Sequence, residues 1–397
     1  MFRIISCFLC LLSLPAAAQD FRIGIFWPPV WKHTNEAQYR TLADAGVDFI
    51  QNVESTDLNT PERNLRMLDL AQAAGLKVYV SDPRVRGSDA DIRAMVEAYR
   101  RHPATAGYYI KDEPDSVQLA WAIATYKTIA SLDPDRVPHV NLFPDFAVKE
   151  YETNYVNRWV EGVGADRLKY LSFDIYPYKV KGRLEKTYYR NLDIIRKAGL
   201  RYRVPTSSYL QSFGIVGMYR LPTTDEMRLN VYSNLAYGIK NPVWFCYATP
   251  TGQGSQKFLN SVIDSLGQKT HLYEPFRQLN REMKQLGKTL RSLDAMEVFH
   301  TGDSLWAGTT PLPAGYFWQP EDRHIPWIIT RFAGPEGREY VMVVNASFTR
   351  PAEPDFRIGL RSLREISKTD GRPRRVRRIT GTFLPGEGRL YEIRRNH

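Results

Sequence analysis

Short apolar segments alternate with amphipathic ones eight times along most of the sequence, and this repeat limits the fold more than any other feature. The segments that we expect to form strands cover residues 21–27, 47–53, 77–81, 107–115, 139–143, 170–176, 202–207 and 242–247. Segments with helical spacing lie between them, and a last one covers residues 273–290. This alternation is typical of a parallel sheet covered by helices. Eight repeats predict an α/β fold, a closed (β/α)8 or TIM barrel.

The sequence changes character after residue 295, where turns, aromatic residues and β-type runs replace the alternation. The runs at residues 328–332 and 340–345 are examples. We therefore predict three parts: a signal peptide at residues 1–18, a barrel at residues 19–295, and a small C-terminal antiparallel β-sandwich domain at residues 296–397. The hydrophobic content of 43% is enough to fill both cores.

The N-terminus has the pattern of a signal peptide. Arg3 precedes an apolar run at residues 4–14 that is too short to span a bilayer, and Pro15 is followed by three alanines. We expect cleavage after Ala18 and export to the periplasm or the extracellular space. Only Cys246 would remain in the mature chain, so no intramolecular disulfide is expected. No second apolar segment is long enough to span a membrane.

The formal net charge is +11, which gives the surface a positive field that favours polyanions. Most basic residues are spread along the chain, but one dense run covers residues 372–378. This run is either a solvated β edge protected by charge or a site for a polyanion. No recognisable nucleic-acid-binding motif is present, so we expect no nucleic-acid partner.

The strand expected at residues 107–115 ends in three carboxylates, Asp112, Glu113 and Asp115. In a (β/α)8 barrel, the C-terminal ends of the strands carry the active site. The alternative is that these carboxylates only cap the helix that begins near Ser116, because acidic residues suit a helix N-terminus. Neighbouring residues of a strand point to opposite faces, so we expect Asp112 and Glu113 to point apart.

Asp174 lies inside an otherwise apolar and aromatic strand, where a carboxylate is costly without partners. It is therefore either structural and hydrogen-bonded or part of a site. The sequence has no Gly-x-Ser-x-Gly elbow, no His-x-x-x-His, no paired cysteines at metal-ligand spacing, no Walker loop, and no Gly-x-Gly-x-x-Gly after a strand. We expect neither a metal nor a cofactor.

The side chains that remain at the predicted strand ends are carboxylates and aromatic rings. Glycoside hydrolysis needs this combination, because one carboxyl group protonates the leaving oxygen and a second attacks the sugar or activates water, while aromatic rings stack on sugars. Glu113 and Asp174 are the candidate catalytic residues. The candidate substrate-binding residues are Trp27, Glu54, Asp82, Asp112, Asn141, Tyr176, Gln211, Trp244 and Tyr247, although any single aromatic could belong to the core instead. The long segments 144–166 and 208–222 are expected to shape a cleft.

The motif Asp112-Glu113-Pro114 resembles the Asn-Glu-Pro strand end of the large clan of retaining (β/α)8 glycoside hydrolases. Residues 230–247 are similar to the strand-eight region of β-galactosidase-like members, and residues 384–391 to their terminal β domain. The resemblance implies a secreted glycosidase that cleaves an oligo- or polysaccharide, with Glu113 as general acid/base.

One departure from this clan concerns the nucleophile, which in the clan is a glutamate at the end of strand seven. Residues 203–211 contain no carboxylate. Asp174 is then the best second carboxylate, as nucleophile if it lies close to Glu113 or as general base if a water fits between them. Crowding of Glu113 by Asp112, Asp115 or Asp174 would raise its pKa, as a general acid requires.

Two other functions remain open from the sequence. The missing strand-seven carboxylate is compatible with a carbohydrate-binding barrel that has lost catalysis. A polysaccharide lyase is the third option, with Tyr176 or Lys111 as the base that removes the proton alpha to a uronate. The positive net charge is compatible with an anionic carbohydrate, such as a uronic-acid or sulfated polymer, as the partner.

Overall fold

The computed structural model describes residues 21–51, 59–182, 184–251 and 254–395. Within these residues, eight parallel strands form a closed barrel, which confirms the predicted fold class. Neighbouring strands pair in chain order, and β8 returns to β1. The strands are β1 Gly24–Phe26, β2 Phe49–Gln51, β3 Lys77–Val80, β4 Thr105–Asp112, β5 Val137–Leu142, β6 Leu171–Phe173, β7 Thr206–Gln211 and β8 Asn241–Phe245.

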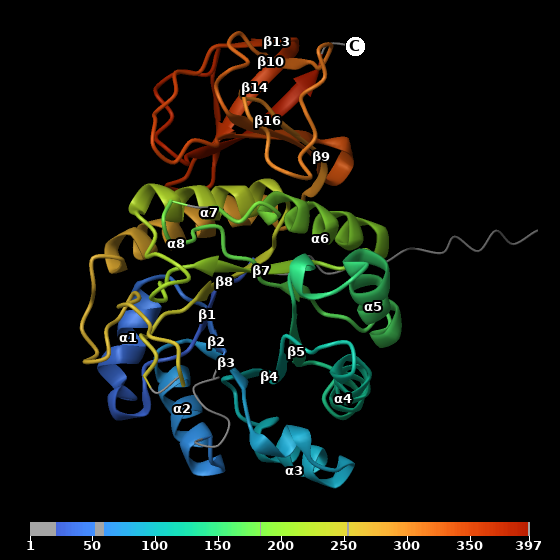
Figure 1. The fold of residues 1–397 in the computed structure, drawn as a ribbon, viewed down its shortest axis with the longest axis vertical. Helices are drawn as coiled ribbons and strands as arrows, with labels where there is room; N and C mark the ends of the chain where they lie inside the picture. The colour runs from blue at the N-terminus through green and yellow to red at the C-terminus, as the bar shows by residue number, and fades with distance from the viewer. Residues whose placement is uncertain (1–20, 52–58, 183, 252–253, 396–397) are drawn as a thin grey trace, which may run out of the picture.

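Helices surround the barrel on its outside (Figure 1). They are α1 Glu36–Asp44, α2 Pro61–Ala73, α3 Asp89–Tyr99, α4 Gln118–Leu132, α5 Arg158–Val163, α6 Tyr188–Tyr202, α7 Thr224–Ala236 and α8 Tyr273–Leu290. Short 3-10 turns cover Trp31–His33, Pro83–Arg86, Asp145–Ala147 and Pro335–Gly337, and a π-helical segment covers Tyr151–Asn157. The helix predicted at residues 273–290 has these same bounds in the structure.

Strand seven is displaced from its predicted position. The sequence predicts it at residues 202–207, but α6 continues to Tyr202 and β7 begins only at Thr206. Arg203 has a left-handed φ of 56°, a conformation that commonly ends a helix, and Pro205 disfavours helical geometry at the residue before it. The shift places Gln211 at the C-terminal end of the strand.

The barrel wall carries one apolar layer on its outside and another on its inside. Outward-facing strand residues such as Ile25, Val78 and Leu210 pack against the helices in one large buried cluster. The interior is filled by aromatic rings and a valine: Phe26, Phe49, Tyr79, Tyr109, Tyr209 and Val243. Alternation of the two faces along each strand therefore accounts for the near-continuous apolar character of the strand segments.

The C-terminal region forms antiparallel sheets. Its strands are β9 Asp294–His300, β10 Trp318–Pro320, β11 Trp327–Ala333, β12 Glu339–Asn345, β13 Phe356–Ile358, β14 Leu360–Ile366, β15 Pro373–Arg375 and β16 Gly388–Arg395. Six of them form one sheet in the order β15-β14-β16-β12-β11-β9, and β10 pairs with β13. Helix α7 contacts β7 of the barrel on one side and β11 and β12 on the other, so it lies between the two regions (Figure 1).

Three further expectations concern the charged run at residues 372–378, the single cysteine of the mature chain, and membrane-spanning helices. β15 lies at the edge of the six-stranded sheet and its residues are exposed, so Pro373–Arg375 form the charged β edge that was one interpretation of the run at residues 372–378. Cys246 is buried and forms no disulfide among the described residues. None of the described helices combines the length and the apolar composition needed to cross a membrane.

Candidate active site

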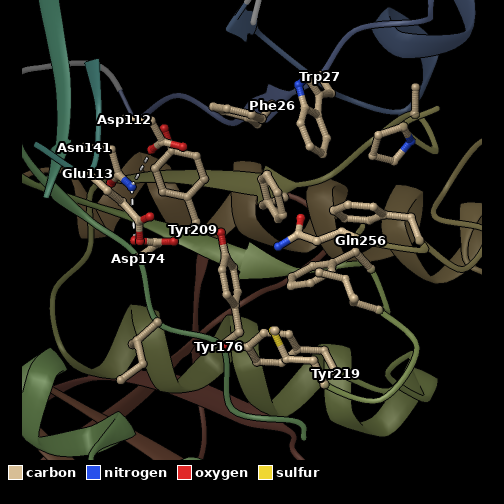
Figure 2. Close-up of a pocket in the computed structure, with 18 of the residues that line it drawn as sticks. Phe26, Trp27, Asp112, Glu113, Asn141, Asp174, Tyr176, Tyr209, Tyr219 and Gln256 are labelled. Atoms are coloured by element: carbon tan, nitrogen blue, oxygen red, sulfur yellow. Dashed lines mark hydrogen bonds between the residues drawn. The ribbon is translucent and has the colours of Figure 1, made fainter. Parts of the chain in front are cut away.

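A cavity of about 860 Å³ is lined by residues at and beyond the C-terminal ends of the barrel strands. Six of the predicted site residues line it, and Figure 2 labels all of them: Trp27, Asp112, Glu113, Asn141, Asp174 and Tyr176. Both long segments contribute to its walls, the first through Pro144 and Phe146 and the second through Phe213, Ile215, Met218 and Tyr219. The structure therefore brings the predicted carboxylates and several aromatics into one space.

The acidic side of the cavity is built from three neighbouring strands. Asp112 ends β4, Asn141 lies near the end of β5, and Asp174 directly follows β6. The Asn141 amide donates through Nδ2 to Asp112 Oδ1 at 3.2 Å and to Asp174 Oδ1 at 3.1 Å (Figure 2). Its own oxygen accepts a bond from the Ser172 hydroxyl at 3.1 Å. Asn141 thus holds two carboxylates in fixed positions above the barrel.

Asp112 and Glu113 do not point to opposite faces, as the alternation of a strand predicts. Both line the same cavity. β4 ends at Asp112, and Glu113 has a left-handed φ of 47°, so the alternation stops between them. The backbone N–H of Glu113 still donates to the carbonyl of Asn141 at 2.9 Å. Left-handed backbone in a non-glycine residue is strained, and such strain is concentrated at functional sites.

The pKa of Glu113 is raised, first by burial and then by the negative charges of Asp174 and Asp112. The pKa of Asp174 is also raised, first by burial and then by the charge of Asp112, whereas hydrogen bonds from Tyr176, Asn141 and Glu113 lower it. Because the pKa of Glu113 is raised further than that of Asp174, the pair favours the proton on Glu113 and the negative charge on Asp174. The direction expected for Glu113 is confirmed, with burial contributing more than crowding.

Asp115 caps the start of helix α4 and is not part of this carboxylate group. Its Oδ1 accepts bonds from the backbone N–H groups of Val117 at 2.9 Å and Gln118 at 2.8 Å. The interpretation of the acidic segment as a helix cap therefore holds for Asp115 alone. Asp112 and Glu113 face the cavity instead.

The opposite side of the cavity is aromatic. Trp27 follows β1, and its ring lies 5.1 Å from Phe245 and 5.5 Å from Phe258, measured between centroids. Tyr176 contacts Phe213 at 4.8 Å and Phe245 at 5.4 Å, again between centroids. Trp27, like Glu113, has a left-handed φ, here 55°. These rings form a wall of the kind on which the apolar face of a sugar can stack.

Several wall residues were not among the sequence candidates: Phe213, Tyr219, Phe245, Phe258 and Gln256. The available signal was the density of aromatic residues just beyond strands seven and eight. It was weak because these residues come from long segments whose course the apolar pattern does not determine.

Tyr209, which lines the cavity, is held by a polar group inside the barrel. Tyr209 donates to Gln51 Oε1 at 2.5 Å, and His139 lies within hydrogen-bonding distance of both, 3.1 Å from Gln51 and 3.2 Å from Tyr209. Burial lowers the pKa of His139 to about 3. The imidazole is therefore neutral at ordinary pH and supports Tyr209 without adding a charge beneath the carboxylates.

Two predicted binding residues have structural roles instead. Asp82 is 1% exposed, caps the turn that follows it, and accepts bonds from Arg84 and from the Tyr99 hydroxyl at 2.6 Å. Gln211 is fully buried and bonds to backbone groups of Tyr178 and Arg220, which fixes the segment beyond β7. Both predictions of substrate contact are corrected, because these polar groups are already satisfied within the protein.

Two predicted aromatics also lie away from the cavity. Trp244 is fully buried and donates through Nε1 to Asn280 of α8 at 2.7 Å. Tyr247 is fully buried beside Phe276, with 5.8 Å between ring centroids. Both belong to the layer between barrel and helices, so their assignment as substrate contacts is wrong. Glu54, the remaining candidate, lies outside the described residues.

Among the described residues, no group of three or more His, Cys, Asp or Glu side chains is arranged to hold a metal ion. The fold and the site together define a class: a (β/α)8 barrel with a carboxyl pair at the C-terminal ends of strands four and six and an aromatic wall opposite. Barrels of this class carry their chemistry at this end.

Solved structures with the same fold include several glycoside hydrolases. A β-galactosidase from Bacillus circulans sp. alkalophilus is 10% identical over 94% of this chain and 99% of its own, with a TM-score of 0.63. A family 5 glycoside hydrolase from Bacteroides vulgatus is 14% identical over 94% and 89%, with a TM-score of 0.56. A β-galactosidase from the psychrophilic Marinomonas ef1 is 13% identical over 69% of this chain, which spans only 62% of that enzyme, with a TM-score of 0.52.

At these identities the likeness establishes the fold. No protein-family model and no curated protein matches the sequence. Function therefore has to be inferred from the residues of the site itself.

Proposed function

We propose that this protein is a glycoside hydrolase in which Glu113 is the general acid/base and Asp174 is the second carboxylate. The observation that carries the proposal is a pair of carboxyl groups in one cavity, in which the pKa of Glu113 is raised further than that of Asp174, facing an aromatic wall. Glycosidases need one protonated and one ionised carboxyl group on the two sides of the bond that they cleave. The glycoside hydrolases with the same fold support this choice of reaction.

In the proposed reaction, the Glu113 carboxyl gives its proton to the glycosidic oxygen as the bond from that oxygen to the anomeric carbon breaks. Asp174 attacks the same carbon and forms a glycosyl ester. Water then attacks the anomeric carbon, Glu113 takes the proton from this water, and the ester to Asp174 breaks. Both carboxyl groups return to their starting protonation states.

The contact between Glu113 and Asp174 favours the role of nucleophile for Asp174 over that of general base. Inverting enzymes hold their two carboxyl groups about 6.5–9.5 Å apart to leave room for water, and retaining enzymes about 5–5.5 Å apart. Two observations place the two carboxyl groups close together: both line one cavity, and the charge of Asp174 raises the pKa of Glu113. This closeness supports the shorter, retaining separation.

The substrate proposed is an oligo- or polysaccharide outside the cytoplasm. The signal-peptide pattern at residues 1–18 supports export to the periplasm or the extracellular space, and these residues lie outside the part that the structure describes. The cavity volume of about 860 Å³ supports binding of more than one sugar ring.

The test compares the mature chain with its Glu113→Gln variant on a panel of neutral and anionic oligosaccharides, with reducing-end release as the readout. The variant should lose hydrolysis by about 10²–10⁴-fold, the usual contribution of a general acid, while sugar binding stays nearly unchanged. Proton NMR of the fresh product should give the retained anomer.

Equal sugar binding by both proteins with no release from either would contradict the proposal. That result would favour the carbohydrate-binding barrel, to which the absence of a carboxylate at the end of β7 already points. Release of unsaturated products would instead identify a lyase.

A further inference from the structure

A second cavity of about 500 Å³ lies beside the candidate active site, between the turn that follows β3 and the start of α4. It shares two lining residues with the first cavity, Arg86 and Asp112. The two spaces are therefore neighbours along one face of the barrel. A chain of sugars bound at the carboxyl pair can continue into the second space.

Two cations line this second cavity, Arg86 and Lys111. Within the described ranges, neither forms an ion pair or a side-chain hydrogen bond with another residue. Arg84, in the same turn as Arg86, differs in this respect, because it pairs with Asp82 at 2.8 Å. Arg84 is thus part of the local structure, whereas Arg86 and Lys111 keep their charges available to a ligand.

The second cavity also contains an aromatic residue suited to a sugar ring. Trp121, half-buried on α4, lines it and offers an aromatic ring for stacking. Asp112, at the boundary, already accepts a bond from Asn141. The positive charge of Lys111 also lowers the pKa of Asp112 and Glu113, so its ammonium group lies within electrostatic range of the proposed general acid/base.

We propose that this second cavity is a subsite for an anionic sugar unit, in which Arg86 and Lys111 bind the carboxylate of a uronate or the sulfate of a sulfated sugar. Arginine suits both groups because its planar guanidinium can form two parallel hydrogen bonds to their oxygens. The subsite rests on the proposed function, since it would select the sugar next to the bond that is cleaved. It assigns the substrate to the class of anionic polysaccharides.

The test measures binding by calorimetry, with the full mature chain carrying Glu113→Gln so that no probe is consumed. The probes are matched pairs: uronate-containing oligosaccharides beside their carboxyl-reduced forms, and sulfated oligosaccharides beside their desulfated forms. We expect at least one charged probe to bind about tenfold more tightly than its neutral form, as two partly exposed ion pairs would give. The preference should weaken with added salt.

The double variant Arg86→Gln with Lys111→Gln should lose this preference. A matched control, Arg93→Gln with Lys127→Gln, removes the same charge from exposed positions on α3 and α4 that line neither cavity, and it should keep the preference. The uronate and sulfate arms identify which anion the subsite accepts.

Equal binding of charged and neutral probes, or a preference lost equally in the control, would overturn the subsite. Hydrolysis by the parent chain is measured separately. If neutral oligosaccharides are cleaved in a Glu113-dependent way without any charge preference, only the subsite fails. If charge-dependent binding occurs without any hydrolysis, only the proposed reaction fails.

Discussion

The two sides of the cavity are built in different ways. The acidic side comes from three neighbouring strands, with Asp112, Asn141 and Asp174 at or just beyond their C-terminal ends. The aromatic side gathers rings from segments far apart in the chain, from Trp27 to Phe258. The barrel thus fixes charged groups through its backbone register, while longer segments supply most of the aromatic wall.

The two sides share one backbone feature. Glu113 on the acidic side and Trp27 on the aromatic side both have left-handed φ values, 47° and 55°. Each residue follows directly on the end of its strand, and each side chain faces the cavity. Because this conformation is unfavourable for bulky residues, its occurrence on both sides supports a function for this cavity.

The largest expected effect comes from breaking the acidic side at Asp174. Asp174→Ala should lower kcat by at least about 10²-fold, because it removes the group that attacks the anomeric carbon. Added azide should restore turnover and yield a glycosyl azide of inverted configuration, detected by NMR. Activity within tenfold of the parent would show that Asp174 does not have this role.

Breaking the aromatic side should affect binding more than chemistry. Trp27→Ala should raise KM about tenfold, corresponding to roughly 1.4 kcal/mol, while kcat changes little, because the ring contacts ground and transition states alike. Trp27→Phe keeps an aromatic ring at the same backbone position and should recover most of the affinity. A loss confined to kcat would contradict this division between the two sides.

The smallest expected effect comes from removing the charge of Asp112 on the acidic side of the cavity. The charge of Asp112 raises the pKa of both Glu113 and Asp174, so Asp112→Asn should lower both. Activity requires Asp174 ionised and Glu113 protonated, so the plot of kcat/KM against pH should be bell-shaped. Its two limbs should move together to lower pH, by about one unit. Unchanged limbs would mean that Asp112 does not act on the pair through its charge.

The acidic side could largely be anticipated from the sequence. A carboxylate at the end of an apolar strand is recognisable from the residues alone, and the rule that barrel chemistry lies at the C-terminal strand ends brings Glu113 and Asp174 together. The direction of Glu113 relative to Asp112 could not be anticipated, because it depends on the left-handed φ of Glu113 itself. The predicted position of strand seven was also wrong, since Tyr202 still belongs to α6 and β7 begins with the polar residues Thr206, Ser207 and Ser208, which give little strand signal.

The aromatic side was decided by tertiary structure. Trp244 and Tyr247 are as aromatic as Phe245, yet they face the helices while Phe245 faces the cavity. Which ring faces which side depends on the register of β8 within the closed barrel and on the course of the segments that cover it. Composition and periodicity determined that this chain forms a barrel with carboxylates at its open end. Only packing decided which rings line the cavity and which fill the core, because both environments bury the same kind of surface.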